Sequence, residues 1–292
     1  MGRFLLHLVA IIVVVFSFAK TVQAANSQVE IRSDGVFLFN SKPYFPLCFR
    51  GPLWYTASSS EWQSIANYGF NCTTDQVAMG IVNSTWTPWN FSQTPAWEVE
   101  QANKNPGHLF YFVMDDVSGP DALNTSQKEH MKNISLLDPN HPMWTNSQWR
   151  GGFPLSQLAE FGRQTGTSVY STYDFNSLGQ GWLATGMWGA ANIYPGPGKG
   201  SVLSYISAYH TYLLGELSIF DRYYSAIDAI VGGAKGLIFF ADCAGDDVTS
   251  YGGCDWPHYA QTQTFRHVLL IGQVLRNSMP GLTGGQKCRG CP

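Results

Sequence analysis

Charged side chains are scarce in this 292-residue chain, because only 13% of its residues are Asp, Glu, Lys or Arg. The small surplus is acidic, since 17 basic residues stand against 20 acidic ones. A nucleic-acid-binding protein needs a basic patch or stripe, so this balance excludes nucleic acid as the expected partner. Because charged residues are few, solubility must depend mainly on neutral polar side chains and on any attached glycans.

Long apolar runs are absent beyond the N-terminus. Arg3, the apolar stretch 5–19 and the small-residue site Val22-Gln-Ala24 predict a signal peptide over residues 1–24, with a retained signal anchor as the alternative. Removing it takes away Arg3 and Lys20 and leaves 15 basic and 20 acidic residues, a net charge of −5. No later run approaches the roughly 18 apolar residues that a spanning helix needs. We therefore expect a secreted, extracellular protein without membrane contact after cleavage.

Linker-like segments and internal repeats are also absent, so residues 25–292 are predicted to form one domain. Six cysteines in an exported chain favour disulfides. Cys48 and Cys72 fall at matching places on neighbouring predicted strands, and Cys243 and Cys254 bracket a Gly/Asp-rich loop. The tail motif Cys288-Arg-Gly-Cys291 leaves two interpretations open, a third disulfide or self-association with another chain.

Five Asn-x-Ser/Thr sequons offer sites for N-linked glycans. We expect glycosylation at two to four of them, and we doubt Asn71, because it lies in a predicted buried strand. The four candidates are Asn83, Asn90, Asn124 and Asn133.

One apolar run ends abruptly in two carboxylates. Residues 109–114 predict a strand buried on both faces, and Asp115 and Asp116 follow directly. In α/β folds the carboxyl ends of the strands carry the chemistry, because loops converge there on a rigid sheet. The alternative interpretation is that the pair caps the helix predicted over residues 122–137.

Strand-like and helix-like segments alternate along the chain, which predicts an α/β fold. Further strands are expected at 42–49, 70–72, 168–173, 202–209 and 237–241, and a short one begins at Met143-Trp144. A (β/α)8 TIM-like barrel is the leading architecture for this length. A doubly wound open sheet is the alternative, but the chain lacks a Gly-rich phosphate loop after its first strand.

Two departures from a regular barrel are expected. Residues 29–39 alternate around Asp34-Gly35, a hairpin-type turn, and predict a short β-ribbon ahead of the barrel. Between about residues 75 and 107 the chain is irregular, so the third βα unit is expected to be degenerate or partly lost.

Several segments together resemble the secreted (β/α)8 glycoside hydrolases whose acid/base carboxylate ends the fourth strand. The resemblance covers most of residues 30–280. It rests on Lys42-Pro-Tyr-Phe-Pro46 after Asp34-Gly35, Tyr68-Gly-Phe-Asn71, Phe110 to Asp116, Leu137-Asp-Pro-Asn-His-Pro142 and Gly233-Ala-Lys-Gly-Leu-Ile-Phe239.

This resemblance implies that Asp116 is the proton donor of a glycosidic hydrolysis. The family places Glu at this position, and aspartate is shorter by one methylene. An aspartate can still act as an acid where apolar surroundings raise its pKa. The family's second carboxylate ends the seventh strand, where this chain has none, and Glu216 is the nearest candidate. The alternative for Glu216 is a helix N-terminal residue favoured by the helix dipole.

Other side chains are expected around the same barrel mouth. Flat aromatic rings in loops or at strand ends can stack on sugar faces, and polar side chains that end strands can bind sugar hydroxyls. The predicted substrate-binding residues are Trp54, Asp115, Trp144, Asp174, Trp188, Tyr194, His210 and Asp242. No short ligand spacing indicates a metal, and no cofactor is expected.

Two functional hypotheses follow. The leading one is a secreted glycoside-hydrolase-like protein that acts on a polysaccharide or glycan by acid/base hydrolysis. The competing one is a catalytically inactive barrel that serves as an extracellular carbohydrate-binding or structural glycoprotein. The retained Asp pair favours the first hypothesis. The missing Glu, the missing second acid and the irregular third unit favour the other.

Overall fold

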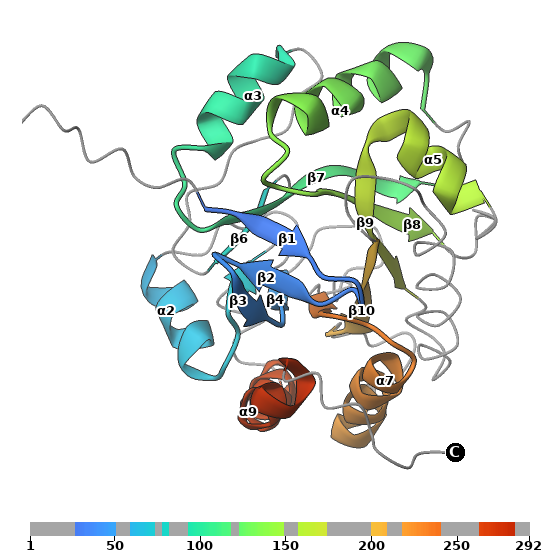
Figure 1. Ribbon diagram of the computed structural model, residues 1–292. Coiled ribbons are helices and arrows are strands. Elements are labelled where there is room, and N and C mark those ends of the chain that lie inside the picture. The colour runs from blue at the N-terminus through green and yellow to red at the C-terminus, as the bar shows by residue number, and fades with distance from the viewer. Residues whose placement is uncertain are drawn as a thin grey trace, which may run out of the picture.

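The protein is an α/β barrel covered by helices, with a small antiparallel ribbon across one end (Figure 1). It is seen in a computed structural model that describes residues 27–50, 59–73, 78–81, 93–117, 123–148, 157–173, 200–208, 218–240 and 263–283. Statements about structure below concern these residues.

The ribbon consists of β1 (Val29–Ile31), β2 (Phe37–Phe39) and β3 (Lys42–Tyr44), paired antiparallel in that order. Gly35 takes a left-handed conformation with φ +83° in the first turn, as the Asp34-Gly35 pair predicted. Asn40 and Ser41 both have positive φ in the second turn, which suits a tight hairpin. The expected ribbon is confirmed, and it has one more strand than the sequence indicated.

The extra strand corrects the first predicted barrel strand. Residues 42–49 were expected to form one strand, but they divide into β3 and β4 (Leu47–Arg50), with Pro46 between them. Proline lacks an N–H group and cannot donate to a sheet ladder, so it separates the two strands.

Eight strands close into a barrel in the order β10-β11-β4-β5-β6-β7-β8-β9. All neighbouring strands pair in parallel except at β6, which is antiparallel to both β5 and β7. The barrel strands after β4 are β5 (Cys72–Thr73), β6 (Ala78–Ile81), β7 (His108–Val117), β8 (Met143–Gln148), β9 (Thr167–Tyr173), β10 (Ser201–Ser207) and β11 (Leu237–Phe240).

The reversed β6 is the irregular third unit that the sequence indicated. Only residues 74–77 separate β5 from β6. A parallel connection needs a dozen or more residues, whereas a short turn can join antiparallel strands. The short link therefore forces β6 to run against its neighbours.

Helices surround the barrel wall (Figure 1). Gly69, with φ +107°, follows the first of these helices. Asn124 and Ser218 begin two others through reciprocal capping boxes. The helices are α2 (Ser59–Asn67), α3 (Pro95–Ala102), α4 (Thr125–Leu137), α5 (Leu158–Thr165), α7 (Ile219–Val231) and α9 (Gln263–Thr283).

The buried side chains form an outer and an inner cluster. The outer cluster packs the barrel wall against the helices, with Phe49, Met131 and Ile206 among its members. The inner cluster fills the barrel and includes Val29 and Phe37 of the ribbon. Ser201 Oγ, at the start of β10, donates to the Gly35 carbonyl at 2.6 Å. The ribbon therefore closes the amino end of the barrel.

Candidate functional site

The two predicted acids lie at the carboxyl end of the longest barrel strand. Asp115 and Asp116 are the eighth and ninth of the ten residues of β7, whose pairing extends to Val117 opposite Ser147. Their side chains lie outside the described part. The backbone position agrees with the prediction that the apolar run ends in this acid pair at the mouth.

An arginine that we did not predict lies inside the barrel near the same end. Arg50 is the last residue of β4 and is only 7% exposed. Its Nη1 donates to the Tyr205 hydroxyl at 3.1 Å, and its guanidinium carbon lies 4.6 Å from the ring centroid of Phe240. A hydrogen bond and a cation–π contact thus hold this cation in place. The sequence did contain a signal for this arginine. Arg50 directly follows a predicted buried strand, as Asp115 and Asp116 do.

Neutral polar side chains of β8 and β9 extend the polar layer that begins with Arg50 and Tyr205. Trp144 Nε1 donates to Ser171 Oγ at 2.9 Å, and Ser171 Oγ donates to Asn146 Oδ1, also at 2.9 Å. All three residues are at most 1% exposed. The upper barrel interior therefore contains a fixed guanidinium, a phenol, an amide and a hydroxyl. Arg50 is the most exposed of the four, and a guanidinium can donate to a sugar hydroxyl or to an anion.

Trp144 does not occupy the mouth position that the sequence suggested. It is the second residue of β8, and parallel strands begin at the end of the barrel opposite the mouth. Its ring stacks on Phe112 with centroids 4.0 Å apart and lies 6.2 Å from Tyr205. The ring is 0% exposed, so we reassign Trp144 from sugar contact to barrel core.

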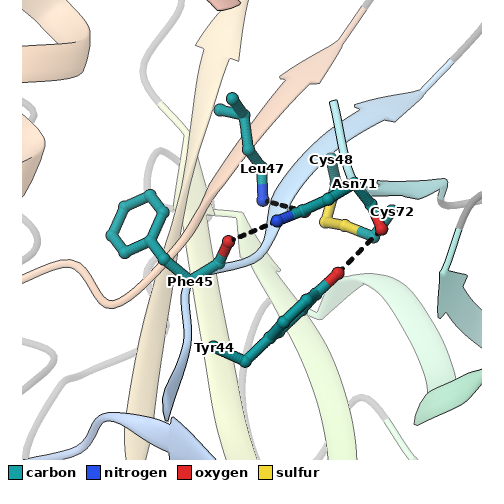
Figure 2. The surroundings of a disulfide bond; sticks show 6 residues. All are labelled: Tyr44, Phe45, Leu47, Cys48, Asn71 and Cys72. Atoms are coloured by element: carbon teal, nitrogen blue, oxygen red, sulfur yellow. Dashed lines mark hydrogen bonds between the residues drawn. A yellow bond between two sulfur atoms is a disulfide. The ribbon is translucent and has the colours of Figure 1, made fainter. Parts of the chain in front are cut away.

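The predicted disulfide between Cys48 and Cys72 is confirmed (Figure 2). The two residues are direct neighbours across β4 and β5 and belong to the inner cluster. Beside them, Asn71 Oδ1 accepts from the Leu47 backbone N–H at 2.8 Å, and Asn71 Nδ2 donates to the Phe45 carbonyl at 3.0 Å. The disulfide and this amide together join β5 to the segment at β4.

The amide contacts also bear on glycosylation. The Asn71 nitrogen that would carry a glycan is already bound to Phe45, in keeping with our doubt about this sequon. Asn124 and Asn133 are exposed on α4 or at its cap, so a glycan could reach them without displacing a core contact. Their occupancy stays a prediction.

The remaining predicted residues lie outside the described part of the chain, and nothing is concluded about them. They are Trp54, Asp174, Trp188, Tyr194, His210, Glu216 and Asp242, the sequons Asn83 and Asn90, and the second predicted disulfide, Cys243 and Cys254.

A second polar cluster lies at the amino end, next to the ribbon. Asp138 Oδ2 accepts from the Tyr111 hydroxyl at 2.7 Å and lies 2.8 Å from His141 Nδ1. His141 Nε2 lies 2.9 Å from Ser27 Oγ. Burial would raise the pKa of Asp138, but the hydrogen bonds from His141 and Tyr111 outweigh burial and lower it. This cluster fastens the start of the ribbon to the segment before β8.

His108 lies beside this cluster and is completely buried. Its ring centroid is 4.5 Å from those of both Tyr111 and His141. Burial, together with the nearby His141, holds the pKa of His108 well below its ordinary value. His108 is therefore neutral in the folded protein at neutral pH.

No group of three or more His, Cys, Asp or Glu side chains among the described residues is arranged to hold a metal ion. Within the same ranges, no helix combines the length and apolar character required to cross a membrane.

Comparisons with known proteins give structural likenesses only. No protein-family model and no curated protein matches the chain. Among solved structures, the carboxyl transferase domain of Rhizobium etli pyruvate carboxylase with pyruvate and biocytin matches at TM-score 0.34 and 14% identity, over 64% of this chain and 32% of that one. The YdjI aldolase from Escherichia coli K12 matches at TM-score 0.34 and 10% identity, over 82% and 92%.

This chain therefore spans about a third of the length of the pyruvate carboxylase structure. Structural similarity at this level does not indicate a function. The fold described above rests on the strand order and pairing of the molecule itself.

Proposed function

We propose that the protein is a carbohydrate-active barrel, derived from the (β/α)8 fold, that hydrolyses a glycosidic bond of a polysaccharide or glycan at the carboxyl end of its strands. In this proposal Asp116 donates the proton to the leaving oxygen. The proposal includes secretion, which places the enzyme where such polymers occur.

The observation that carries the proposal is the polar layer beneath the mouth. Arg50, Asn146, Ser171 and Tyr205 gather inside the barrel toward the end at which β7 presents its acid pair. The most exposed of them, Arg50, can donate to a ligand rich in hydroxyl groups, and the buried others hold the layer rigid beneath it. The wall of parallel strands holds them in register, as a site for a polar polymer requires.

The inactive carbohydrate-binding barrel is the second candidate, and one observation favours it. Among the described residues that fill the upper barrel interior, none is a carboxylate, whereas glycoside hydrolysis needs two. Binding needs only the polar layer. The two candidates therefore differ in whether a second acid approaches Asp116.

The test is polysaccharide hydrolysis by the purified protein, run beside the variant Asp116→Asn. We expect sugar release from at least one plant, algal or fungal polymer, and a loss of about 100-fold or more in the variant, because general acid catalysis supplies that much. Asp228→Asn, on the outer helix α7, is the matched control and should retain full activity. Equal release by the Asp116 variant would refute the assigned role, and glycan binding without any release would establish the inactive barrel.

A further inference from the structure

A cavity of about 540 Å³ opens beside the ribbon, at the amino end of the barrel and away from the mouth. Its walls come from β1, from α4, and from the segment that includes Asp138 and His141 and leads into β8. This volume lies in the range of small-molecule and peptide pockets. Nothing in the proposed glycan chemistry uses this cavity.

One wall of the cavity is the outer edge of a β-strand. The Gln28 carbonyl accepts from Asn40 N–H on the ribbon side, whereas Val29 N–H points outward and donates to the Asn140 carbonyl at 2.8 Å. Arg32 N–H again faces the ribbon and donates to the Val36 carbonyl. Backbone groups alternate in an antiparallel strand, so the N–H and C=O of Ile31 face outward, on the cavity side.

The buried wall of the cavity is rigid, because its polar atoms bind one another. Asp138 Oδ2 contacts Tyr111 and His141, Asp138 Oδ1 accepts from Asn140 N–H at 3.1 Å, and His141 Nε2 contacts Ser27. These groups shape the cavity without presenting a reactive atom to it. Selectivity must therefore come from the strand edge and from the charges at the rim.

The rim carries two cations on the helix side. Lys132 of α4 and Arg163 of α5 both line the cavity, and Arg163 also pairs with Glu160. On the ribbon side Glu30 accepts from the Gln28 amide at 3.0 Å. None of the described lining residues is Phe, Tyr or Trp, so the cavity lacks the flat ring on which sugars stack.

From these observations we propose that the cavity binds an extended peptide segment that adds as a strand to the outer edge of β1. An acidic side chain of that segment lies against Lys132 and Arg163. Strand addition supplies affinity through backbone hydrogen bonds, and the rim supplies specificity through charge. Ile31 and Leu136, which is exposed on α4, line the cavity and offer apolar contacts to side chains of the peptide.

Binding is tested by fluorescence anisotropy with labelled hexapeptides of alternating Thr and Val. One series carries a single Glu at each position in turn, and the matched series carries Lys instead. A third series repeats the best Glu peptide with single N-methyl groups, which remove one backbone donor at a time without changing the protein. The full-length protein is compared with Lys132→Glu/Arg163→Glu and with the control Lys128→Glu, one turn away on α4 and outside the lining.

At least one Glu peptide should bind in the micromolar range, and the double variant should weaken it by about tenfold or more. Lys128→Glu should leave binding unchanged, and N-methylation at alternate positions should abolish it. Equal binding of Glu and Lys peptides, no loss on N-methylation, or no binding of any Glu peptide at millimolar concentration would overturn the proposal. Glycan hydrolysis is unaffected in either case, because it occurs at the other end of the barrel.

Discussion

Replacing Trp144 with alanine should destabilise the protein by about 4 kcal/mol, the usual cost of removing a large buried aromatic side chain. The ring is fully buried, and it stacks on Phe112 inside the barrel. Truncation also leaves the Ser171 hydroxyl without the indole N–H that donates to it. Guanidinium unfolding at constant pH measures the change in the free energy of unfolding.

Trp144→Phe is the matched control. It keeps one aromatic ring in the core but loses volume and the indole N–H. The lost hydrogen bond should add about 1 kcal/mol to the cost of the lost volume. A ring that served as a sugar platform would behave differently: its removal would weaken glycan binding with little loss of stability. A change below about 1 kcal/mol for Trp144→Ala would contradict the core assignment.

Acidification from about pH 7 to pH 5 should destabilise the protein through His108. The pKa of His108 is lowered in the folded state, so at pH values below about 6.5 the unfolded chain binds a proton that the folded protein does not. Stability is therefore full above that value and falls as the pH drops toward the folded pKa. The slope approaches about 1.4 kcal/mol per pH unit.

His108→Phe separates this effect from the rest of the titration. Phenylalanine keeps a ring beside Tyr111 and His141 but cannot take up a proton in the unfolded state. His130, whose pKa burial also lowers, contributes in the same direction in both proteins. Unfolding curves at several pH values should show a shallower loss for the variant. An equal loss in the free energy of unfolding on acidification in the two proteins would show that His108 titrates normally in the folded state.

The sequence predicted the elements whose signals are local. Apolar runs marked the strands, and the Asp34-Gly35 pair marked a turn that requires a positive φ. The Cys48–Cys72 disulfide could be predicted because equivalent positions on adjacent parallel strands lie side by side. The strand and turn signals each lie within one short segment, and the disulfide requires only that two neighbouring strands be recognised.

Features that depend on contacts between distant residues could not be predicted from the sequence. The direction of β6 depends on the short link 74–77 and on pairing with β7, and its apolar pattern fits either direction. The sequence placed Trp144 at the start of a strand, but it could not show that the ring packs on Phe112 inside the barrel. The cluster of Ser27, His108 and His141 joins residues up to 114 positions apart, and no local pattern indicates it.

The central claim is that a glycan binds at the carboxyl end of the barrel, above Arg50 and Asn146. The most direct measurement is a crystal structure of Asp116→Asn with the oligosaccharide that the protein binds most tightly in a panel screen. We expect a sugar ring at the mouth, with hydroxyl groups within hydrogen-bond distance of the Arg50 guanidinium. A sugar bound only elsewhere on the molecule, or no oligosaccharide bound at all, would contradict it.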